Sequence, residues 1–122
     1  MKNVLLTTLL AAFSISSYAQ LTTHSWDFGG DTRQYKQYVP SIYTGNEPVA
    51  LVIALHGLGD NMNNFSQVGF HQVADTANII VVTPEALVDV LITGSTAWNS
   101  GAGVAGISLN AGVDDVGFIN AL

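Results

Sequence analysis

Hydrophobic and polar residues are arranged along the middle of the chain as they are in the strands of a sheet. Residues 33–39 alternate between polar and apolar side chains, which indicates an outer strand, and Pro40 ends this run. Residues 50–55 contain no polar side chain, so they predict a central strand that is buried on both faces. Residues 79–82 are four branched apolar side chains in succession, and they predict a second buried strand that the following Thr-Pro pair closes.

A helix is predicted between the two buried strands. Apolar residues recur at spacings of about 3.6 through residues 65–77, as they do on the face of a helix that lies against a sheet. A strand, a helix and a strand in succession pair in parallel through a right-handed crossover. The fold class predicted is therefore α/β, with a mostly parallel sheet and helices on both of its faces.

The pattern is weaker in the last third of the chain. Residues 86–92 fit a strand or a helix, and residues 93–112 form a loop rich in glycine, serine and asparagine around Trp98. A loop of this length is unusual unless it shapes a site. Residues 114–115, two aspartates, predict the start of a helix. The helical pattern then reaches the last residue without a stop signal, so we expect the sequence to be interrupted inside an element.

The start of the chain has the pattern of a secretory signal. Lys2 gives a weakly positive beginning, residues 4–15 are mostly apolar, and small residues precede Gln20. This apolar run is shorter than the roughly 20 residues that a membrane-spanning helix needs. We therefore expect residues 1–19 to be a signal peptide, residues 20–122 to form one domain, and the mature protein to be secreted into the periplasm or the extracellular space.

Charge and cysteine content exclude several classes of partner. Without Lys2, two basic residues stand against nine acidic ones, so the mature chain is strongly acidic. This balance argues against nucleic acid as a partner, and against an anionic membrane once the signal has been removed. There is no cysteine, hence no disulfide, thiolate nucleophile or cysteine-bound metal. His24 and His71 have no partner at ligand spacing, so no metal site is expected.

The turn after the central strand carries the clearest chemistry. His56, Gly57, Leu58 and Gly59 follow the strand at its carboxyl end, where open α/β sheets bind ligands. Ester hydrolysis passes through an oxyanion, which two backbone N–H groups about 2.7–3.1 Å away stabilise. We expect the Leu58 N–H to be the first such donor and the Gly59 N–H the second, with Gly57 permitting the tight turn.

Two other interpretations concern the same four residues, which we call the HGLG loop. Glycine could be used in this loop for steric reasons alone, in an ordinary strand-to-helix turn. His56 could serve as a general base, but in folds of this kind the base histidine comes after the nucleophile in the chain. We therefore expect His56 to be a structural residue that hydrogen-bonds across the loop.

Several further patterns resemble functional motifs without the context that those motifs need. Residues 101–106 match G-x-G-x-x-G, but no strand precedes them and no acidic residue follows at the required distance. Asp114 and Asp115 point about 100° apart on a helix, so they cannot act as a carboxylate pair. Residues 106–110 miss the G-x-S-x-G elbow by one position, and no G-x-S-x-G occurs elsewhere. We expect no cofactor.

A succession of short motifs covers nearly all of the chain after residue 19. The motifs are Arg33-x-Tyr35, Tyr38-Val39-Pro40, Pro48 with the strand into Leu55-His56-Gly57, Ala74-Asp75, Ile80-Val81-Val82-x-Pro84, Trp98, and Val113-Asp114-Asp115-Val116-x-Phe118-Ile119. In this order and at these spacings, the chain resembles the secreted polyhydroxybutyrate depolymerase and feruloyl esterase group of α/β-hydrolases.

The resemblance implies a carboxylic-ester hydrolase that uses serine, histidine and aspartate without a metal or organic cofactor. Its substrate would be a polyester, a feruloylated polysaccharide or a small acyl ester. In this family the nucleophile elbow follows the helix that contains residues 113–119, so the chain would be the N-terminal part of the fold, truncated before the elbow. The triad would be absent, and the fragment alone would be inactive. The alternative is a secreted, non-catalytic binding module in which the HGLG loop is only architecture.

Overall fold

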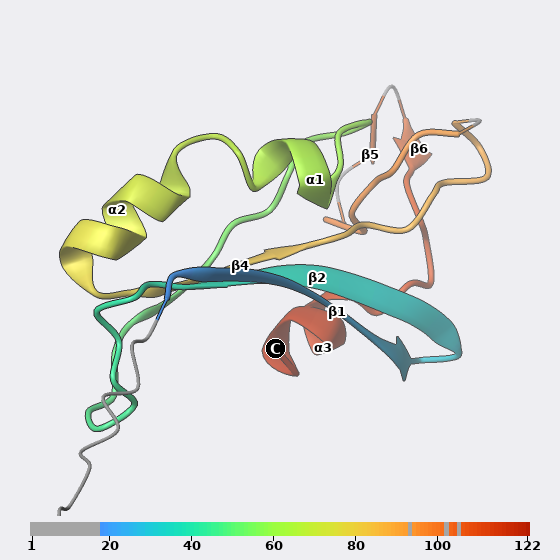
Figure 1. Ribbon diagram of the computed structural model, residues 1–122. Coiled ribbons are helices and arrows are strands. Elements are labelled where there is room, and N and C mark those ends of the chain that lie inside the picture. Colours follow the sequence, from blue (N-terminus) through green and yellow to red (C-terminus); the bar gives the residue numbers. More distant parts are fainter. Residues whose placement is uncertain (1–17, 93, 102, 105) are drawn as a thin grey trace, which may run out of the picture.

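The computed structural model describes residues 18–92, 94–101, 103–104 and 106–122 (Figure 1). Apart from Tyr18 and Ala19, the expected signal peptide lies outside the described residues. A four-stranded sheet has the order β1-β2-β4-β3. Its strands are β1 (Gln20–Phe28), β2 (Asp31–Val39), β3 (Leu51–Ile53) and β4 (Ile80–Pro84). The remaining elements are helices α1 (Met62–Phe65), α2 (Phe70–Ala77) and α3 (Asp115–Asn120), and a small hairpin of β5 (Gly103–Val104) and β6 (Ile107–Ser108).

The described sheet is mostly antiparallel, which corrects the expected mostly parallel sheet. β1 pairs antiparallel with β2, and β2 pairs antiparallel with β4, whereas β3 and β4 are parallel as predicted. The difference arises at Gly29 and Gly30, which have φ angles of +65° and +96°. Two consecutive residues with positive φ make the tight turn that joins antiparallel strands, so β1 folds back along β2.

Strand β3 lies at the edge of the described sheet, although its sequence predicted a central strand buried on both faces. β4 is its neighbour on one side, and no described strand pairs with the other side. Leu51 and Leu55 accordingly remain 48% and 42% exposed. An apolar run shows how strongly a strand favours burial, but it does not fix how many neighbouring strands cover it.

The helix predicted for residues 65–77 is interrupted. Gly69, with a φ angle of +99°, separates α1 from α2, and the left-handed Asn78 follows the end of α2. The side chain of Asn61 caps α1 by accepting a hydrogen bond from the Asn64 N–H at 3.0 Å. Both helices cover one face of the sheet (Figure 1). There Ala74, which is fully buried, packs among the core residues Tyr38, Ala54 and Val81.

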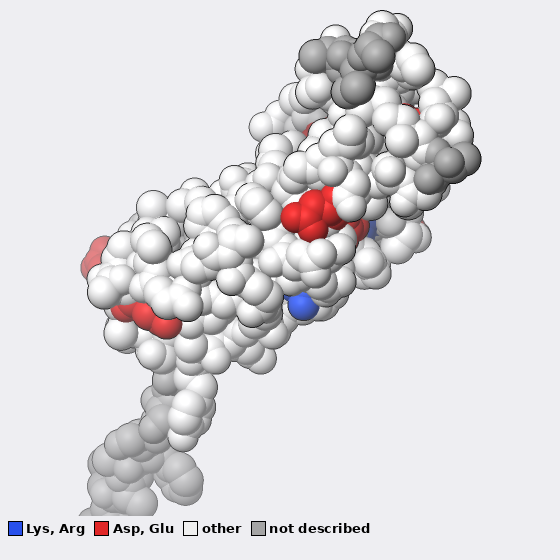
Figure 2. Space-filling view, turned by 90° about the horizontal axis from the view of Figure 1, so that it is seen from above, with Lys and Arg blue, Asp and Glu red and all other residues white. Residues whose placement is uncertain are grey.

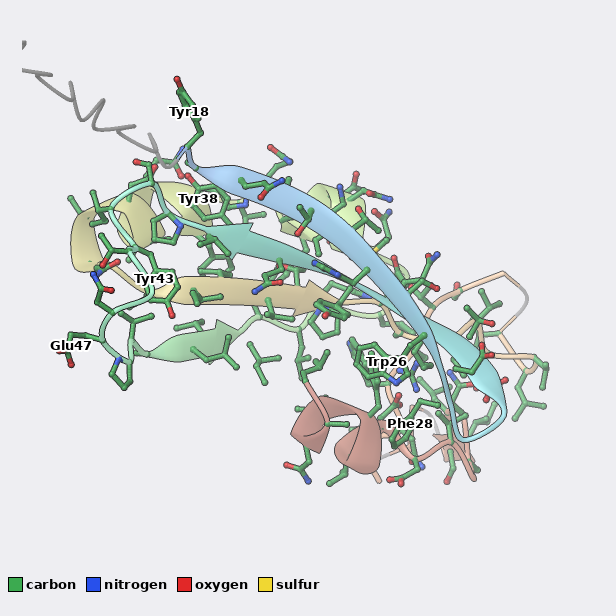
Figure 3. All side chains as sticks on the ribbon, turned by 60° about the horizontal axis from the view of Figure 1, so that its bottom comes forward. Tyr18, Trp26, Phe28, Tyr38, Tyr43 and Glu47 are labelled. Atoms are coloured by element: carbon green, nitrogen blue, oxygen red, sulfur yellow. The ribbon has the colours of Figure 1, made fainter. Side chains whose placement is uncertain are left out.

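Helix α3 covers the opposite face of the sheet, so helices lie on both faces as expected (Figure 1). Trp26 and Phe28 of β1 point toward this helix (Figure 3), and their ring centroids lie 5.4 and 6.0 Å from that of Phe118. The predicted helix start is confirmed, because the Asp114 side chain accepts a hydrogen bond from the Gly117 N–H at 2.8 Å. The described residues contain no helix that is both long and apolar enough to cross a bilayer.

A buried ion pair fastens α3 to the sheet. Arg33 Nη2 of β2 donates to Asp115 Oδ1 at 2.7 Å, and both side chains are almost wholly shielded from solvent. The guanidinium carbon lies 4.0 Å from the centroid of the Phe118 ring, which adds a cation–π contact. The second oxygen of Asp115 accepts the Asn99 N–H at 2.6 Å. The pair therefore also fixes the segment that follows Trp98.

Candidate functional site

The HGLG loop leaves the sheet at the carboxyl end of the parallel strand pair. The Ala54 N–H donates to the Val82 carbonyl at 2.8 Å, so the backbone stays attached to β4 for one residue beyond β3. After β3 the chain turns away from the sheet toward α1 (Figure 1). The structure therefore places this loop at the end of the sheet where its sequence predicted it.

His56 is buried and makes structural contacts in three directions. Its Nδ1 lies 2.9 Å from the Gly57 carbonyl, and its Nε2 accepts the Ala86 N–H at 3.1 Å. Its own carbonyl accepts the indole N–H of Trp98 at 3.0 Å. As expected, His56 hydrogen-bonds across the loop, and these bonds connect the loop to both of the segments beside it.

The positive backbone angle of the loop lies at Gly59 and not, as expected, at Gly57. Gly59 has a φ angle of +76°, whereas the φ angle of Gly57 lies outside the left-handed region. Gly59 is therefore the residue that permits the tight turn. Its N–H donates to the Thr96 carbonyl at 2.9 Å, so it is engaged within the fold. Gly59 would have to give up this hydrogen bond to serve as the second oxyanion donor, and that role stays a prediction.

We expect Gly59→Ala to lower the free energy of unfolding by about 1–3 kcal/mol, because alanine is strained at this backbone angle. The strain is conformational, since a Cβ at Gly59 would approach no atom closer than Ser95 Oγ at 4.0 Å. The matched control is Gly57→Ala, whose Cβ would meet nothing within 4 Å. The control should change stability by less than about 0.5 kcal/mol. Urea denaturation measures both, and equal losses would contradict this division of roles.

Like the N–H groups of His56 and Gly57, the Leu58 N–H is a backbone donor that the loop leaves available. Within the described part of the chain it donates to no protein acceptor. The Leu58 side chain is about half exposed, so the loop is not closed over at this point. An accessible backbone donor at the end of a parallel strand can bind an anionic or partly charged oxygen.

A cavity of about 220 Å³ lies beside this amide. Residues 56–58 form one side of it, and the other sides come from Ala97, Trp98, Ser100 and Leu109. Trp98 is held in place by its bond to the His56 carbonyl, and its ring lies 5.3 Å from the imidazole, centroid to centroid. The sequence placed Trp98 in a loop whose length is unusual unless it shapes a site, and the structure brings Trp98 against the HGLG loop.

A second cavity, of about 200 Å³, lies beside Asp89 and Asn110. The Asp89 carboxylate is already saturated by the backbone N–H groups of Leu91, Ile92 and Asn110. The bond from Asn110 is the main cause that lowers the pKa of Asp89, the two other bonds add to it, and burial opposes them. Asp89 therefore connects Leu91 and Ile92 with Asn110 through hydrogen bonds. Its sequence context did not indicate this role.

Charged side chains are sparse around the molecule. Figure 2 shows a largely uncharged face with small groups of acidic residues. Among the described residues the basic side chains are Arg33 and Lys36, and Arg33 is only 2% exposed. No group of three or more histidine, cysteine or acidic side chains in the described part of the chain could hold a metal ion.

Comparison with known proteins shows the fold. No protein-family model matches the chain, and no curated protein matches it. A solved structure that is similar to it is an S-formylglutathione hydrolase from Agrobacterium tumefaciens, with a TM-score of 0.53 and 19% sequence identity. This chain has an esterase-like fold. The match covers 70% of this chain and 34% of the hydrolase, so the chain spans about a third of that protein's length.

At 19% sequence identity, this similarity supports the fold but not a particular family or activity. It agrees with the α/β-hydrolase class at a coarse level, although the described part of the sheet is mostly antiparallel. The polyhydroxybutyrate depolymerase and feruloyl esterase group stays a prediction from the sequence motifs.

Proposed function

We propose that this chain is part of a serine-dependent carboxylic-ester hydrolase and contributes a backbone donor of its oxyanion hole. The observation that carries this function is the Leu58 N–H, which has no protein acceptor in the described residues and belongs to a residue that lines the cavity beside Trp98. The esterase-like fold supports the same reaction class. A donor fixed before the substrate arrives costs no reorganisation when negative charge develops on the carbonyl oxygen.

The mechanism divides between this chain and the residues that would complete it. The 122 residues contain no G-x-S-x-G motif, so in this assignment serine, histidine and aspartate belong to sequence beyond them. The serine would attack the ester carbonyl, and the Leu58 N–H would donate to the oxygen that becomes negative. Residues 97–98 would border the acyl or alcohol group of the substrate. This chemistry needs a nucleophile, a base and oxyanion donors, and we assign no cofactor.

For the substrate we propose a polyester, a feruloylated polysaccharide or a small acyl ester, and for the location a secreted protein. The sequence motifs of the depolymerase and feruloyl esterase group support the substrate classes. The signal-like pattern of residues 1–19 supports secretion. The acidic balance of the chain favours neither nucleic acid nor an anionic membrane as a partner.

The test is labelling by a fluorophosphonate probe, together with hydrolysis of p-nitrophenyl esters. We expect the intact gene product to be labelled at one serine and to hydrolyse the esters. The 122-residue chain alone should show neither reaction, because it lacks an activated nucleophile. An intact gene product without labelling and without turnover would reject the hydrolase and favour a non-catalytic binding module. Labelling of the 122-residue chain would reject the division of the catalytic residues.

A further inference from the structure

Glu85, the residue after β4, contacts both ends of the segment that contains the candidate oxyanion donor. Its Oε2 accepts the Met62 N–H at 3.0 Å, at the start of α1. Its Oε1 lies 2.9 Å from Nε2 of His56. The segment of residues 56–62 leaves the sheet at His56 and enters α1 at Met62. A single carboxylate therefore spans the base of the loop that presents the Leu58 N–H.

The backbone of Glu85 is itself anchored to the sheet. Its N–H donates to the Gln34 carbonyl at 2.9 Å, and its carbonyl accepts Arg33 Nη2 at 3.3 Å. Both partners belong to β2, one of the two inner strands of the described sheet. Because this backbone cannot shift independently, the carboxylate is a fixed reference point for the loop.

The hydrogen bonds of His56 leave its Nε2 without a proton to donate to Glu85, so Glu85 holds the loop through the Met62 N–H. The Gly57 carbonyl can only accept, so the hydrogen bond to it places a proton on Nδ1. Nε2 then accepts the Ala86 N–H, which completes the hydrogen bonding of the ring. Glu85 Oε1 is buried and has no hydrogen-bond donor of its own. A buried polar atom without a partner is uncommon and costs stability.

We propose that Glu85 is a positioning residue, which fixes residues 56–62 and thereby directs the Leu58 N–H into the cavity. Only the effect of this role on catalysis rests on the proposed function. From the far side the loop is held by Thr96, whose hydroxyl donates to the Asp60 carbonyl and whose own carbonyl accepts the Gly59 N–H. Without Glu85 the loop would lose its attachment at the base, so these outer contacts would be left to hold it alone and would open more often.

The direct test is amide hydrogen exchange in the intact gene product. Glu85→Ala removes both contacts, and we expect the Gly59 amide to exchange at least tenfold faster relative to the Ala54 amide, which reports on the sheet. Glu85→Gln should keep the wild-type rate, because its side-chain carbonyl can still accept from the Met62 N–H. Glu47→Ala, which removes an exposed glutamate from a distant turn, is the matched control and should also keep it.

Unchanged Gly59 exchange in Glu85→Ala would overturn the positioning role whatever the activity of the protein. If Glu85→Ala does not fold, an amide-to-ester replacement at Met62 removes one of the two contacts without changing any side chain. It should still accelerate exchange at Gly59 more than at Ala54. Equal acceleration at the two amides would mean that Glu85 contributes to overall stability alone, and would reject the proposal.

Activity gives a second readout that separates this role from the proposed function. With active sites counted by fluorophosphonate labelling, Glu85→Ala should lower kcat at least tenfold and change KM less than twofold, and Glu85→Gln should restore kcat. A wild-type protein without esterase activity would reject the proposed function and leave the exchange result to decide the positioning role. Altered exchange with unchanged kcat would reject the catalytic consequence.

Discussion

Replacing Asp115 by alanine should lower the free energy of unfolding by about 3–5 kcal/mol, because it leaves the Arg33 charge buried without a partner. Arg33 Nη2 lies 2.7 Å from Asp115 Oδ1, with the two side chains 1% and 3% exposed. The guanidinium cannot give up its proton, so it must stay charged in the interior or leave it. The substitution also deprives the Asn99 N–H of its acceptor. Urea denaturation of the intact gene product measures the loss.

The neighbouring Asp114 supplies the matched control. It is exposed, and its side chain caps α3 through the Gly117 N–H at 2.8 Å. Loss of such a cap costs about 0.5–2 kcal/mol. The double variant Arg33→Met with Asp115→Leu should recover much of the stability lost in Asp115→Ala, since it removes both charges together. Similar losses for Asp114→Ala and Asp115→Ala would show that the ion pair is not the main contribution.

Removal of the Leu58 N–H should lower kcat for ester hydrolysis by about 10²–10³ and leave KM nearly unchanged, because an oxyanion donor acts mainly in the transition state. An amide-to-ester replacement at Leu58 in the intact gene product removes this one donor and keeps the side chain. The measurement is steady-state hydrolysis of p-nitrophenyl esters, corrected for the number of active sites.

The same backbone replacement at Gly59 is the control. It removes the hydrogen bond to the Thr96 carbonyl, which belongs to the fold. Its main effect should therefore be a lower Tm, with a smaller loss of kcat. If the Gly59 replacement reduces kcat as much as the Leu58 replacement at an unchanged Tm, the donor has been assigned to the wrong amide.

The local parts of the fold could be predicted from the sequence, and the arrangement of the sheet could not. Residues 51–53 and 80–82 pair in parallel as their apolar composition predicted. Strand β1 was missed although a signal existed, namely the Gly29-Gly30 pair between two alternating stretches. The edge position of β3 had no such signal, since strand order depends on contacts between distant segments.

In the candidate site too, local features could be predicted from the sequence, whereas contacts between distant segments could not. The position of the HGLG loop followed from a strand that ends in a glycine turn, which is a local pattern. Thr96, a residue far along the chain, engages the Gly59 N–H through its carbonyl and so decides that this amide is not available. Glu85 could not be recognised either, because a single glutamate after a strand is ordinary until His56 and Met62 are seen beside it.

The ion pair between β2 and α3 also imposes an order on biosynthesis. Its two residues are separated by 82 positions, so during synthesis Arg33 leaves the ribosome long before its carboxylate partner. The hairpin of β1 and β2 is local and can form early, whereas closing so long a loop is slow and has an entropic cost. Until Asp115 arrives, the guanidinium keeps its water and the face beneath β1 stays open. Docking of α3 is therefore the step that dehydrates Arg33 and completes this half of the core.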